Sequence, residues 1–346
     1  MLKKIILWFC IILTIAAVIA GYFAYTWTYK PNVSLGQDTF KIIYIPTGST
    51  YEDVLRILTE NNILENPESF NRLAEFKKYK SRIKPGKYKI QNNANNNDLI
   101  KMLRSGKQET ITFTFTNIRK KEELISRVGK KLEADSVELT KLMNDNEWLK
   151  QNFGMSSETI ISLFIPNTYE FNWNTSAKEF LKRMQTEYKK FWTAERKQKA
   201  KQLNMTQTQV SILASIVQSE QLAFPDERPI IAGLYLNRLK IGMCLQSDPT
   251  IIYAMGDFSI RRVLDKYKNF DSPYNTYKCT GLPPGPIYIP EISSIDAVLN
   301  YQKNDYLYMC AKEDFSGRHN FAKTLAQHNL NARKYQMALN AQKVWR

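Results

Sequence analysis

The sequence predicts an α+β protein with a single N-terminal transmembrane helix, a small module and a larger mixed α+β domain. Three observations lead to this prediction. An uncharged, largely apolar run extends from Ile5 to Tyr29. Two amphipathic helical patterns lie between two strand-like segments within residues 39–106, and short strands and longer helical patterns alternate through residues 107–346. A chain of 346 residues is long enough for such a division.

The apolar run is long enough to cross a bilayer, which takes about 20 residues of helix. We assign residues 5–27 to a transmembrane anchor and residues 1–4 to a cytoplasmic tail, because Lys3 and Lys4 precede the run. A cleaved signal peptide is the alternative, but its apolar region spans only about 7–15 residues. In both cases the chain beyond the run is exported, and we expect it on the extracytoplasmic (periplasmic) side of the cytoplasmic (inner) membrane.

The charge balance raises three classes of partner. The chain has 49 Lys and Arg against 33 Asp and Glu, a formal net charge of +16. Such a surface attracts nucleic acid, an anionic membrane or an acidic polymer. Because export separates the chain from nucleic acid, we expect no nucleic-acid partner.

The four cysteines show no metal-site pattern. Cys10 lies in the anchor, and Cys244, Cys279 and Cys310 are widely spaced, with no C-x-x-C pair. Zinc sites use closely spaced ligands, so we expect neither a metal nor another cofactor. The exported cysteines are interpreted either as small core residues or as one disulfide with a free thiol.

Residues 39–106 form the predicted small module. Thr39–Ile45 and Lys84–Ile90 are typical of strands, and Thr50–Asp53 can form a capping box at the start of a helix. A second short helix is predicted over Ser69–Phe76. The order strand, helix, helix, strand resembles a LysM module, a fold that binds N-acetylated glycans. A structural spacer without a ligand is the alternative.

Residues 107–205 form the first lobe of the larger domain. An alternating segment predicts a strand over Thr110–Phe115. Apolar residues at helical spacing predict helices over Lys121–Leu132, Ser136–Asn144, Ala177–Trp192 and Ala194–Leu203.

Residues 206–346 contain the candidate site, and Glu220 is its central residue. Thr206 can cap a helix that ends near Glu220. The apolar positions of that helix include Val210, Leu213, Ile216 and Val217. Helical spacing places Glu220 next on the same face, where partial burial raises the pKa of a carboxyl group and suits a general acid. A glutamate that faces solvent in the last turn is the alternative.

Polar turns follow this helix. Asp226 is expected to cap the next helix, over Ile230–Leu239, and Glu227 is interpreted in the same way. Later turns are dense in amides and hydroxyls: Leu245–Thr250, Tyr274–Tyr277 and Gly281–Pro286. Such rigid polar turns are typical of a sugar-binding cleft.

Several short motifs surround these turns in a definite order. They are Leu213–Val217 with Glu220, Glu227-Arg228, Asn237–Leu239, Gly242-Met243, Leu245–Thr250, Ile252-Tyr253, Tyr274–Tyr277, Gly281–Gly285, Leu307-Tyr308, and Gly317 with His319, Phe321 and His328-Asn329. From about residue 110 to the C-terminus, the order and spacing of these motifs resemble the YceG-like (MltG) family of endolytic murein transglycosylases. The anchor and the LysM-like module also lie where that family has them.

The resemblance implies an activity and a catalytic residue. It implies a lyase, a peptidoglycan lytic transglycosylase, that cleaves the β-1,4 bond between N-acetylmuramic acid and N-acetylglucosamine in nascent strands, leaves 1,6-anhydro ends and terminates strand elongation. It places the catalytic glutamate at Glu220. Many members have a second acidic residue where this chain has Gln218, and their Gly-Gly-His stretch appears here as Gly317–His319. His319 and His328 are interpreted as residues that pack a loop.

Four further residues are candidates for binding the glycan or orienting Glu220: Gln246, Asp248, Asn275 and Tyr277. Asp248 is the best second carboxylate, and its alternative role is a turn residue before Pro249. The competing functions are a peptidoglycan hydrolase (muramidase), in which a second carboxylate activates water, and a non-catalytic glycan-binding scaffold. By the resemblance, the partners are glycan strands, the membrane and peptidoglycan synthases.

Overall fold

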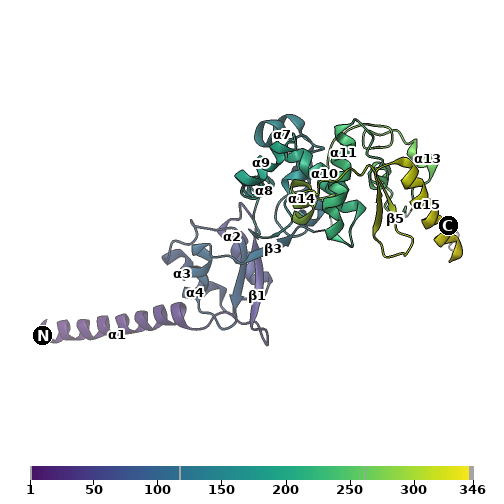
Figure 1. The fold of residues 1–346 in the computed structure, drawn as a ribbon. Coiled ribbons are helices and arrows are strands. Elements are labelled where there is room, and N and C mark those ends of the chain that lie inside the picture. The colour runs from purple at the N-terminus through teal and green to yellow at the C-terminus, as the bar shows by residue number, and fades with distance from the viewer. Residues whose placement is uncertain (1, 117, 261, 343–346) are drawn as a thin grey trace. The chain divides into compact units, whose positions relative to one another are not determined.

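The computed structural model describes residues 2–116, 118–260 and 262–342. They form two compact units (Figure 1). The N-terminal unit contains the chain up to Thr112 together with residues 131–134 and 170–176, and the C-terminal unit contains the rest. The secondary structure is a mixture of many helices and three two-stranded sheets, in agreement with the predicted α+β class.

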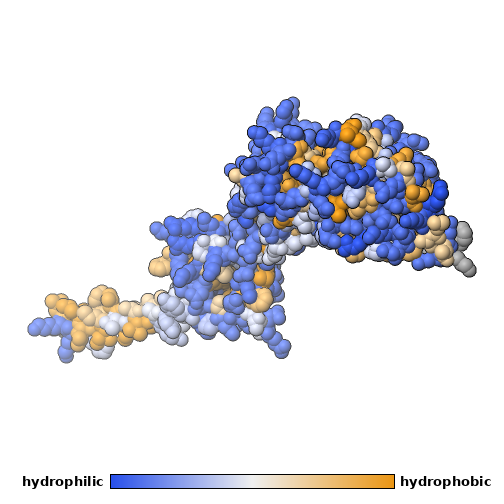
Figure 2. Space-filling model, in the orientation of Figure 1, coloured by the Kyte–Doolittle hydropathy of each residue, from blue (hydrophilic) through white to orange (hydrophobic). Residues whose placement is uncertain are grey.

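The first element of the N-terminal unit is the apolar helix α1 (Leu2–Tyr29). Its most apolar 18-residue window has a mean hydropathy of 2.6, and none of that window is buried. Figure 2 shows its surface as a nearly continuous hydrophobic band. By length and composition α1 can cross a membrane. A signal sequence near an N-terminus has the same length and composition, so these two properties do not distinguish an anchor from a signal sequence.

The remaining elements of this unit surround a small sheet. Strand β1 (Phe40–Ile45) pairs antiparallel with β2 (Gly86–Gln91), with Phe40 opposite Gln91. The helices are α2 (Tyr51–Glu60), α3 (Pro67–Phe76) and α4 (Asn96–Ser105). The predicted capping box is present, since the Thr50 hydroxyl accepts the Asp53 N–H and the Asp53 carboxylate accepts the Thr50 N–H at 2.9 Å. The predicted order of strands and helices is therefore correct, and both the likeness to a LysM module and glycan binding stay predictions.

The core of the N-terminal unit is built from the inward faces of the sheet and helices. It contains the rings of Tyr51, Phe70, Tyr79 and Tyr88 among aliphatic side chains. The C-terminal end of α1 is hydrogen-bonded to this unit: the buried side-chain amide of Asn96 donates to the main-chain carbonyl of Trp27 at 2.9 Å.

The first part of the C-terminal unit is mostly helical. Strands β3 (Thr110–Thr114) and β4 (Thr168–Asn172) form the second sheet, and each strand has residues in both units, with 113–114 and 168–169 in this one. The helices are α5 (Lys121–Gly129), α6 (Ser136–Asn144), α7 (Asn146–Phe153), η1 (Ile160–Leu163), α8 (Ala177–Phe191) and α9 (Ala194–Gln202). Helix α7 lacks a sequence prediction, and it starts where Asp145 caps the N–H of Trp148 at 3.0 Å.

The second part of the C-terminal unit is arranged around helix α10 (Gln207–Glu220), as Figure 1 shows. Its apolar side chains are fully buried, and Thr206 caps it as predicted. The other elements are η2 (Pro225–Glu227), α11 (Arg228–Lys240), α12 (Asp248–Met255), α13 (Asp265–Lys268), α14 (Ile292–Leu299), β5 (Tyr308–Ala311), β6 (His319–Ala322) and α15 (Leu325–Ala341). Strands β5 and β6 pair antiparallel, with Ala311 opposite His319.

The predicted capping role of Asp226 is wrong. Helix α11 starts after Glu227, and neither Asp226 nor Glu227 caps it with a side-chain hydrogen bond. Instead, Asp226 binds Arg318 at 2.7 Å and Glu227 turns into the protein interior. Arg318 and His319, the partners of Asp226 and Glu227, each lie 92 residues further along the chain, where local sequence does not indicate them.

Candidate active site

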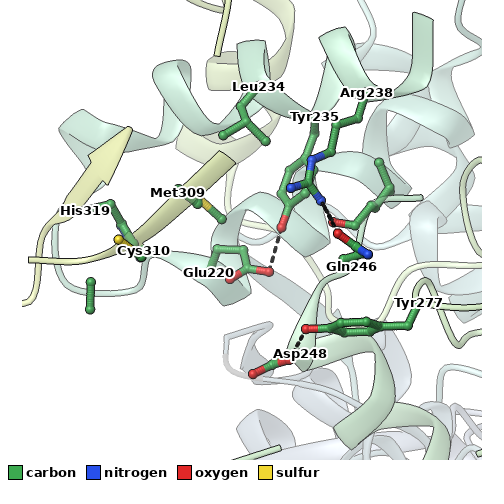
Figure 3. Close-up of a pocket in the computed structure, with 12 residues that line it drawn as sticks. Glu220, Leu234, Tyr235, Arg238, Gln246, Asp248, Tyr277, Met309, Cys310 and His319 are labelled. Atoms are coloured by element: carbon green, nitrogen blue, oxygen red, sulfur yellow. Dashed lines mark hydrogen bonds between the residues drawn. The ribbon is translucent and has the colours of Figure 1, made fainter. Parts of the chain in front are cut away.

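A pocket of about 280 Å³ opens in the C-terminal unit at the end of α10. Its walls come from α10, α11, the start of α12 and the strands β5 and β6 (Figure 3). The lining residues are Glu220, Leu234, Tyr235, Arg238, Leu245, Gln246, Asp248, Tyr277, Met309, Cys310, Ala311 and His319. Four of the five predicted site residues are thus brought to one cavity.

Glu220 is the last residue of α10 and is half-buried in this pocket. The Tyr235 hydroxyl donates to Glu220 Oε1 at 2.7 Å, and the Ser247 hydroxyl donates to the same oxygen at 2.5 Å. Burial of the carboxyl group is the largest influence and raises its pKa; these two donors and His319 oppose the rise, and the charge of Asp248 adds to it. The pKa of Glu220 therefore lies above its ordinary value, as a general acid requires.

The loop that contains Ser247 is held by the turn around Thr276. The Thr276 carbonyl accepts the N–H of Gln246 at 2.9 Å, and its hydroxyl accepts the N–H of Ser247 at 3.0 Å. The same hydroxyl lies 2.8 Å from that of Thr250. These contacts explain why two polar motifs about thirty residues apart form one wall of the pocket.

Asp248 and Tyr277 come from the same two motifs and continue this wall, below Glu220 in the view of Figure 3. The Tyr277 hydroxyl donates to Asp248 Oδ1 at 2.6 Å, and burial followed by this carboxylate raises the pKa of Tyr277 above its usual range. Asn275 does not line the pocket. It is fully buried behind Tyr277, whose N–H it accepts at 2.9 Å, while its amide group donates to the carbonyls of Lys268 and Phe270.

Arg238 connects the pocket walls. Its Nε donates to the carbonyl of Leu307 at 2.6 Å, just before β5, and its Nη1 donates to the carbonyl of Leu245 at 2.7 Å. The Arg238 guanidinium therefore positions two parts of the site around Glu220: strand β5 and the loop that contains Leu245.

The two histidines differ in their surroundings. His319 lines the pocket, and its ring Nδ1 lies 3.0 Å from the buried carboxylate of Glu227. His328 stacks on Tyr308 outside the pocket lining, and burial followed by the charge of Arg238 lowers its pKa. His328 therefore packs helix α15 against Tyr308 and not a loop, and its buried Nδ1 has no hydrogen-bond partner among the described residues. His319 is hydrogen-bonded as predicted, but it also faces the cavity.

The family of the chain is decided by comparison with known proteins. The model of the YceG-like family matches residues 43–334. The chain belongs to the YceG-like family. It is 30% identical over 333 residues to the "Endolytic murein transglycosylase" of Bacillus subtilis (strain 168), with 92% of this chain and 91% of the relative covered.

Two further relatives agree with this assignment. An "Endolytic murein transglycosylase" of Streptococcus pneumoniae is 27% identical, and the match covers 91% of this chain and 62% of that protein. A crystal structure of a yceG-like protein from Listeria monocytogenes superposes with a TM-score of 0.55 at 27% identity, covering 84% of this chain and 98% of that one. The fold of this YceG-like protein is thus shared with an experimentally determined structure.

Gln218 lies on a different side of α10 from the pocket in this YceG-like protein. Its side-chain oxygen accepts the N–H of Glu291 at 2.6 Å and the hydroxyl of Ser294 at 3.1 Å, at the start of α14. Its amide nitrogen is buried and has no hydrogen-bond partner in the described chain. Gln218 therefore connects α10 to α14 and is not placed to act at the pocket.

Sequence reasoning missed three residues of the site: Tyr235, Arg238 and Ser247. A usable signal exists for the first two, because Ile231, Tyr235 and Arg238 recur at helical spacing on α11 and mix polar groups into a buried face. Ser247 lies in the polar turn Leu245–Thr250 noted in the sequence, but no local pattern predicts its contact with Glu220. Across the described ranges no group of three or more His, Cys, Asp or Glu side chains could hold a metal ion, and the four cysteines are unpaired.

Proposed function

We propose that this YceG-like protein is an endolytic peptidoglycan lytic transglycosylase with Glu220 as its acid and base. It cleaves the β-1,4 bond between N-acetylmuramic acid and N-acetylglucosamine and leaves 1,6-anhydro ends. The observation that carries the proposal is the environment of Glu220: a half-buried residue whose carboxyl group has a raised pKa and lines a polar pocket. The names of the B. subtilis and S. pneumoniae relatives support the same reaction.

The two oxygens of Glu220 have different roles in this mechanism. Both hydrogen bonds from Tyr235 and Ser247 end on Oε1, which acts as the carbonyl oxygen of the neutral acid. Within the described residues Oε2 accepts no hydrogen bond, so it carries the proton. In the first step Oε2 gives this proton to the glycosidic oxygen, and the bond from that oxygen to carbon 1 of the muramyl sugar breaks.

The second step needs no water. The oxocarbenium-like centre at carbon 1 is attacked by the 6-hydroxyl oxygen of the same sugar, and the ionised Glu220 takes the hydroxyl proton. Glu220 is then protonated again, so a single carboxyl group serves as acid and base. Tyr235 and Ser247 stabilise the carboxylate between the two steps because their hydroxyl groups already point at Oε1.

We further propose that Gln246, Asp248 and Tyr277 contact the sugars, because all three line the pocket. Asn275 acts on the glycan through Tyr277, since it holds the main chain of that residue. Arg238 and Thr276 position the walls and do not react.

A muramidase is the second candidate, and one observation favours it. Asp248 lines the same pocket as Glu220, and Tyr277 engages only one of its two oxygens. A carboxylate so placed can activate water, as in hydrolases with two carboxyl groups. Mass spectrometry of digested glycan distinguishes the two reactions: 1,6-anhydro ends support the transglycosylase, and reducing ends overturn it in favour of the hydrolase. If the strands stay intact, both enzymatic functions are excluded and the non-catalytic glycan-binding scaffold is the remaining candidate.

We also propose that α1 anchors the chain in the cytoplasmic membrane with both units on the extracytoplasmic side. The apolar surface of α1 and the Lys3 and Lys4 pair before it support this orientation. There the LysM-like module binds nascent glycan, and peptidoglycan synthases are neighbours whose strands are cut. Cys279 is exposed, so a membrane-impermeant maleimide should label it in intact spheroplasts. Labelling only after lysis would overturn the orientation.

A further inference from the structure

A second pocket, of about 180 Å³, lies beside the first in the C-terminal unit. Ser219 and Pro249 line it, while their chain neighbours Glu220 and Asp248 line the first pocket. Consecutive Cα atoms are about 3.8 Å apart. The two pockets therefore border each other along the main chain at 219–220 and 248–249, which forms their shared wall.

The second pocket has an aromatic lining. The rings of Tyr253, Phe258 and Tyr288 face it, together with aliphatic side chains. Leu222 also lines the pocket and is 57% exposed. The pocket therefore offers an apolar surface to a ligand that arrives from solvent.

Two cations lie on this aromatic surface, and neither forms an ion pair with an aspartate or glutamate of the described residues. The guanidinium of Arg119 lies 5.0 Å from the centre of the Phe258 ring and 5.9 Å from that of Tyr288, and Lys120 Nζ lies 5.1 Å from the Phe258 ring. No aspartate or glutamate is among the residues that line the pocket. The nearby carboxylate of Glu123 is occupied, since it accepts the main-chain N–H of Arg119 and pairs with Arg127.

This combination selects a particular ligand chemistry. A guanidinium stacked on aromatic rings keeps its N–H donors free and binds a carboxylate through two parallel hydrogen bonds. The rings and Leu222 favour an aliphatic body attached to that carboxylate. A neutral hexosamine has no such negative charge, whereas the peptide attached to a muramyl sugar has free carboxylates and aliphatic side chains.

We propose that the second pocket binds the acidic stem peptide of the muramyl sugar that is cut, so that peptide-bearing strands are preferred to denuded ones. The inference rests on the proposed function, which places that sugar at Glu220. The peptide is attached to carbon 3 of the same sugar, so it leaves the catalytic pocket within a few ångströms of the shared wall. Arg119 is the residue that recognises its carboxylate.

The test compares one set of glycan strands before and after an amidase removes the peptides. The full chain is assayed in detergent, and kcat/KM for new chain ends is measured on both substrates by mass spectrometry. In Arg119→Gln, we expect the ratio of kcat/KM for peptide-bearing to denuded strands to fall about tenfold. Arg119→Lys, which keeps the charge but loses the planar stacking, should give an intermediate ratio.

Lys189→Gln is the matched control, because Lys189 is an exposed cation of the same unit and the change in net charge is identical. Its ratio should equal that of the wild type. An unchanged ratio in Arg119→Gln overturns the inference. Weaker binding of that variant to phosphatidylglycerol vesicles, with an unchanged ratio, would assign the cations to the membrane surface instead.

A binding measurement separates this inference from the proposed function. Stem peptides released by the amidase are titrated into the Glu220→Gln protein, with and without Arg119→Gln. Binding that is lost with Arg119 supports the pocket even if the wild type makes no anhydro ends. Absence of binding to the Glu220→Gln protein overturns the inference even if the wild type cuts glycan as proposed.

Discussion

Glu227 holds His319 at two points. Its Oε1 accepts the main-chain N–H of His319 at 3.2 Å, and its Oε2 lies 3.0 Å from Nδ1 of the ring. An ionised carboxylate can only accept, so Nδ1 carries a proton and Nε2 is free to accept a hydrogen bond when the ring is neutral. His319 lines the pocket, so its contact with Glu227 leaves Nε2 as the ring nitrogen that can accept a hydrogen bond at the Glu220 site.

Replacement of Glu220 by Gln should abolish most activity and preserve the fold. The amide keeps the volume of the side chain and its Oε1 can still accept from Tyr235 and Ser247, but it has no proton to donate. The rate of anhydro-end formation should fall by about two to four powers of ten. Thermal unfolding monitors the fold, and a variant that cuts glycan at the wild-type rate would remove Glu220 from the mechanism.

Replacement of Asp248 by Asn should shift the pH profile to lower pH. Activity needs protonated Glu220, so kcat/KM is high below the pKa of this group and falls as pH rises through it, above the ordinary value of 4.5. The charge of Asp248 contributes to the raised pKa, and its removal lowers that pKa. The high-pH limb of kcat/KM is the measurement, and a limb that stays in place or moves upward would contradict the coupling.

Replacement of Ser247 by Ala should move the same limb in the opposite direction. The Ser247 hydroxyl stabilises the ionised form of Glu220, so its loss raises the pKa of Glu220 further. Tyr235→Phe removes the other donor and should shift the limb the same way. If either variant shifts it downward, as expected for Asp248→Asn, the assignment of the two donors is incorrect.

Replacement of Glu227 by Ala should destabilise the C-terminal unit. Glu227 is 5% exposed, and its loss removes the acceptor of the His319 N–H and one of the two acceptors of the Gln221 amide, which keeps its bond to the Gly317 carbonyl. An unsatisfied buried group costs about 1–3 kcal/mol in the free energy of unfolding. Urea unfolding at neutral pH measures the loss. Asp226→Ala, which breaks an exposed pair with Arg318, should cost below about 1 kcal/mol.

The pH dependence of this stability difference is a further check on Glu227. Burial raises its pKa, but the stronger combined effect of His319 and Gln221 holds the pKa below its usual value. Its contribution is therefore complete above 4.5 and is lost as pH falls through the lowered pKa. The gap between wild type and Glu227→Ala should narrow below pH 4.5, and a gap that widens there would contradict an ionised Glu227.

Replacement of Gly233 by Ala should destabilise helix α11 although alanine is the better helix former. A Cβ at this position would clash with the main-chain carbonyl of Gln302 and the amide of Asn304, in a loop packed on the helix. The clash should outweigh the gain of about 1 kcal/mol in helix propensity, with a net loss of roughly 1–3 kcal/mol in unfolding free energy. Lys240→Ala, on the exposed end of α11, is the control and should change little.

Much of the local structure could be predicted because neighbouring residues determine it. The apolar run predicts α1, and the caps at Thr50 and Thr206 mark the starts of α2 and α10. The spacing from Val217 to Glu220 places the carboxyl group at the end of a buried stripe. In each case the interacting residues lie within a few positions of each other, so their contacts follow from helix periodicity and capping alone.

Only the tertiary structure decided the chemistry around Glu220. Ser247 reaches this carboxyl group from 27 residues away, and His319 meets Glu227 across 92 residues. Asp226, which looks like a cap, pairs with Arg318, and Asn275, which looks like a ligand residue, is buried behind Tyr277. The sequence indicated Glu220 as the sheltered carboxyl group and left a solvent-facing side chain as the alternative. The tertiary structure decided between them, since other elements surround α10 and bury every residue from 210 to 218. The donors that tune the pKa of Glu220 depend on how distant loops pack, and chain connectivity does not encode that packing locally.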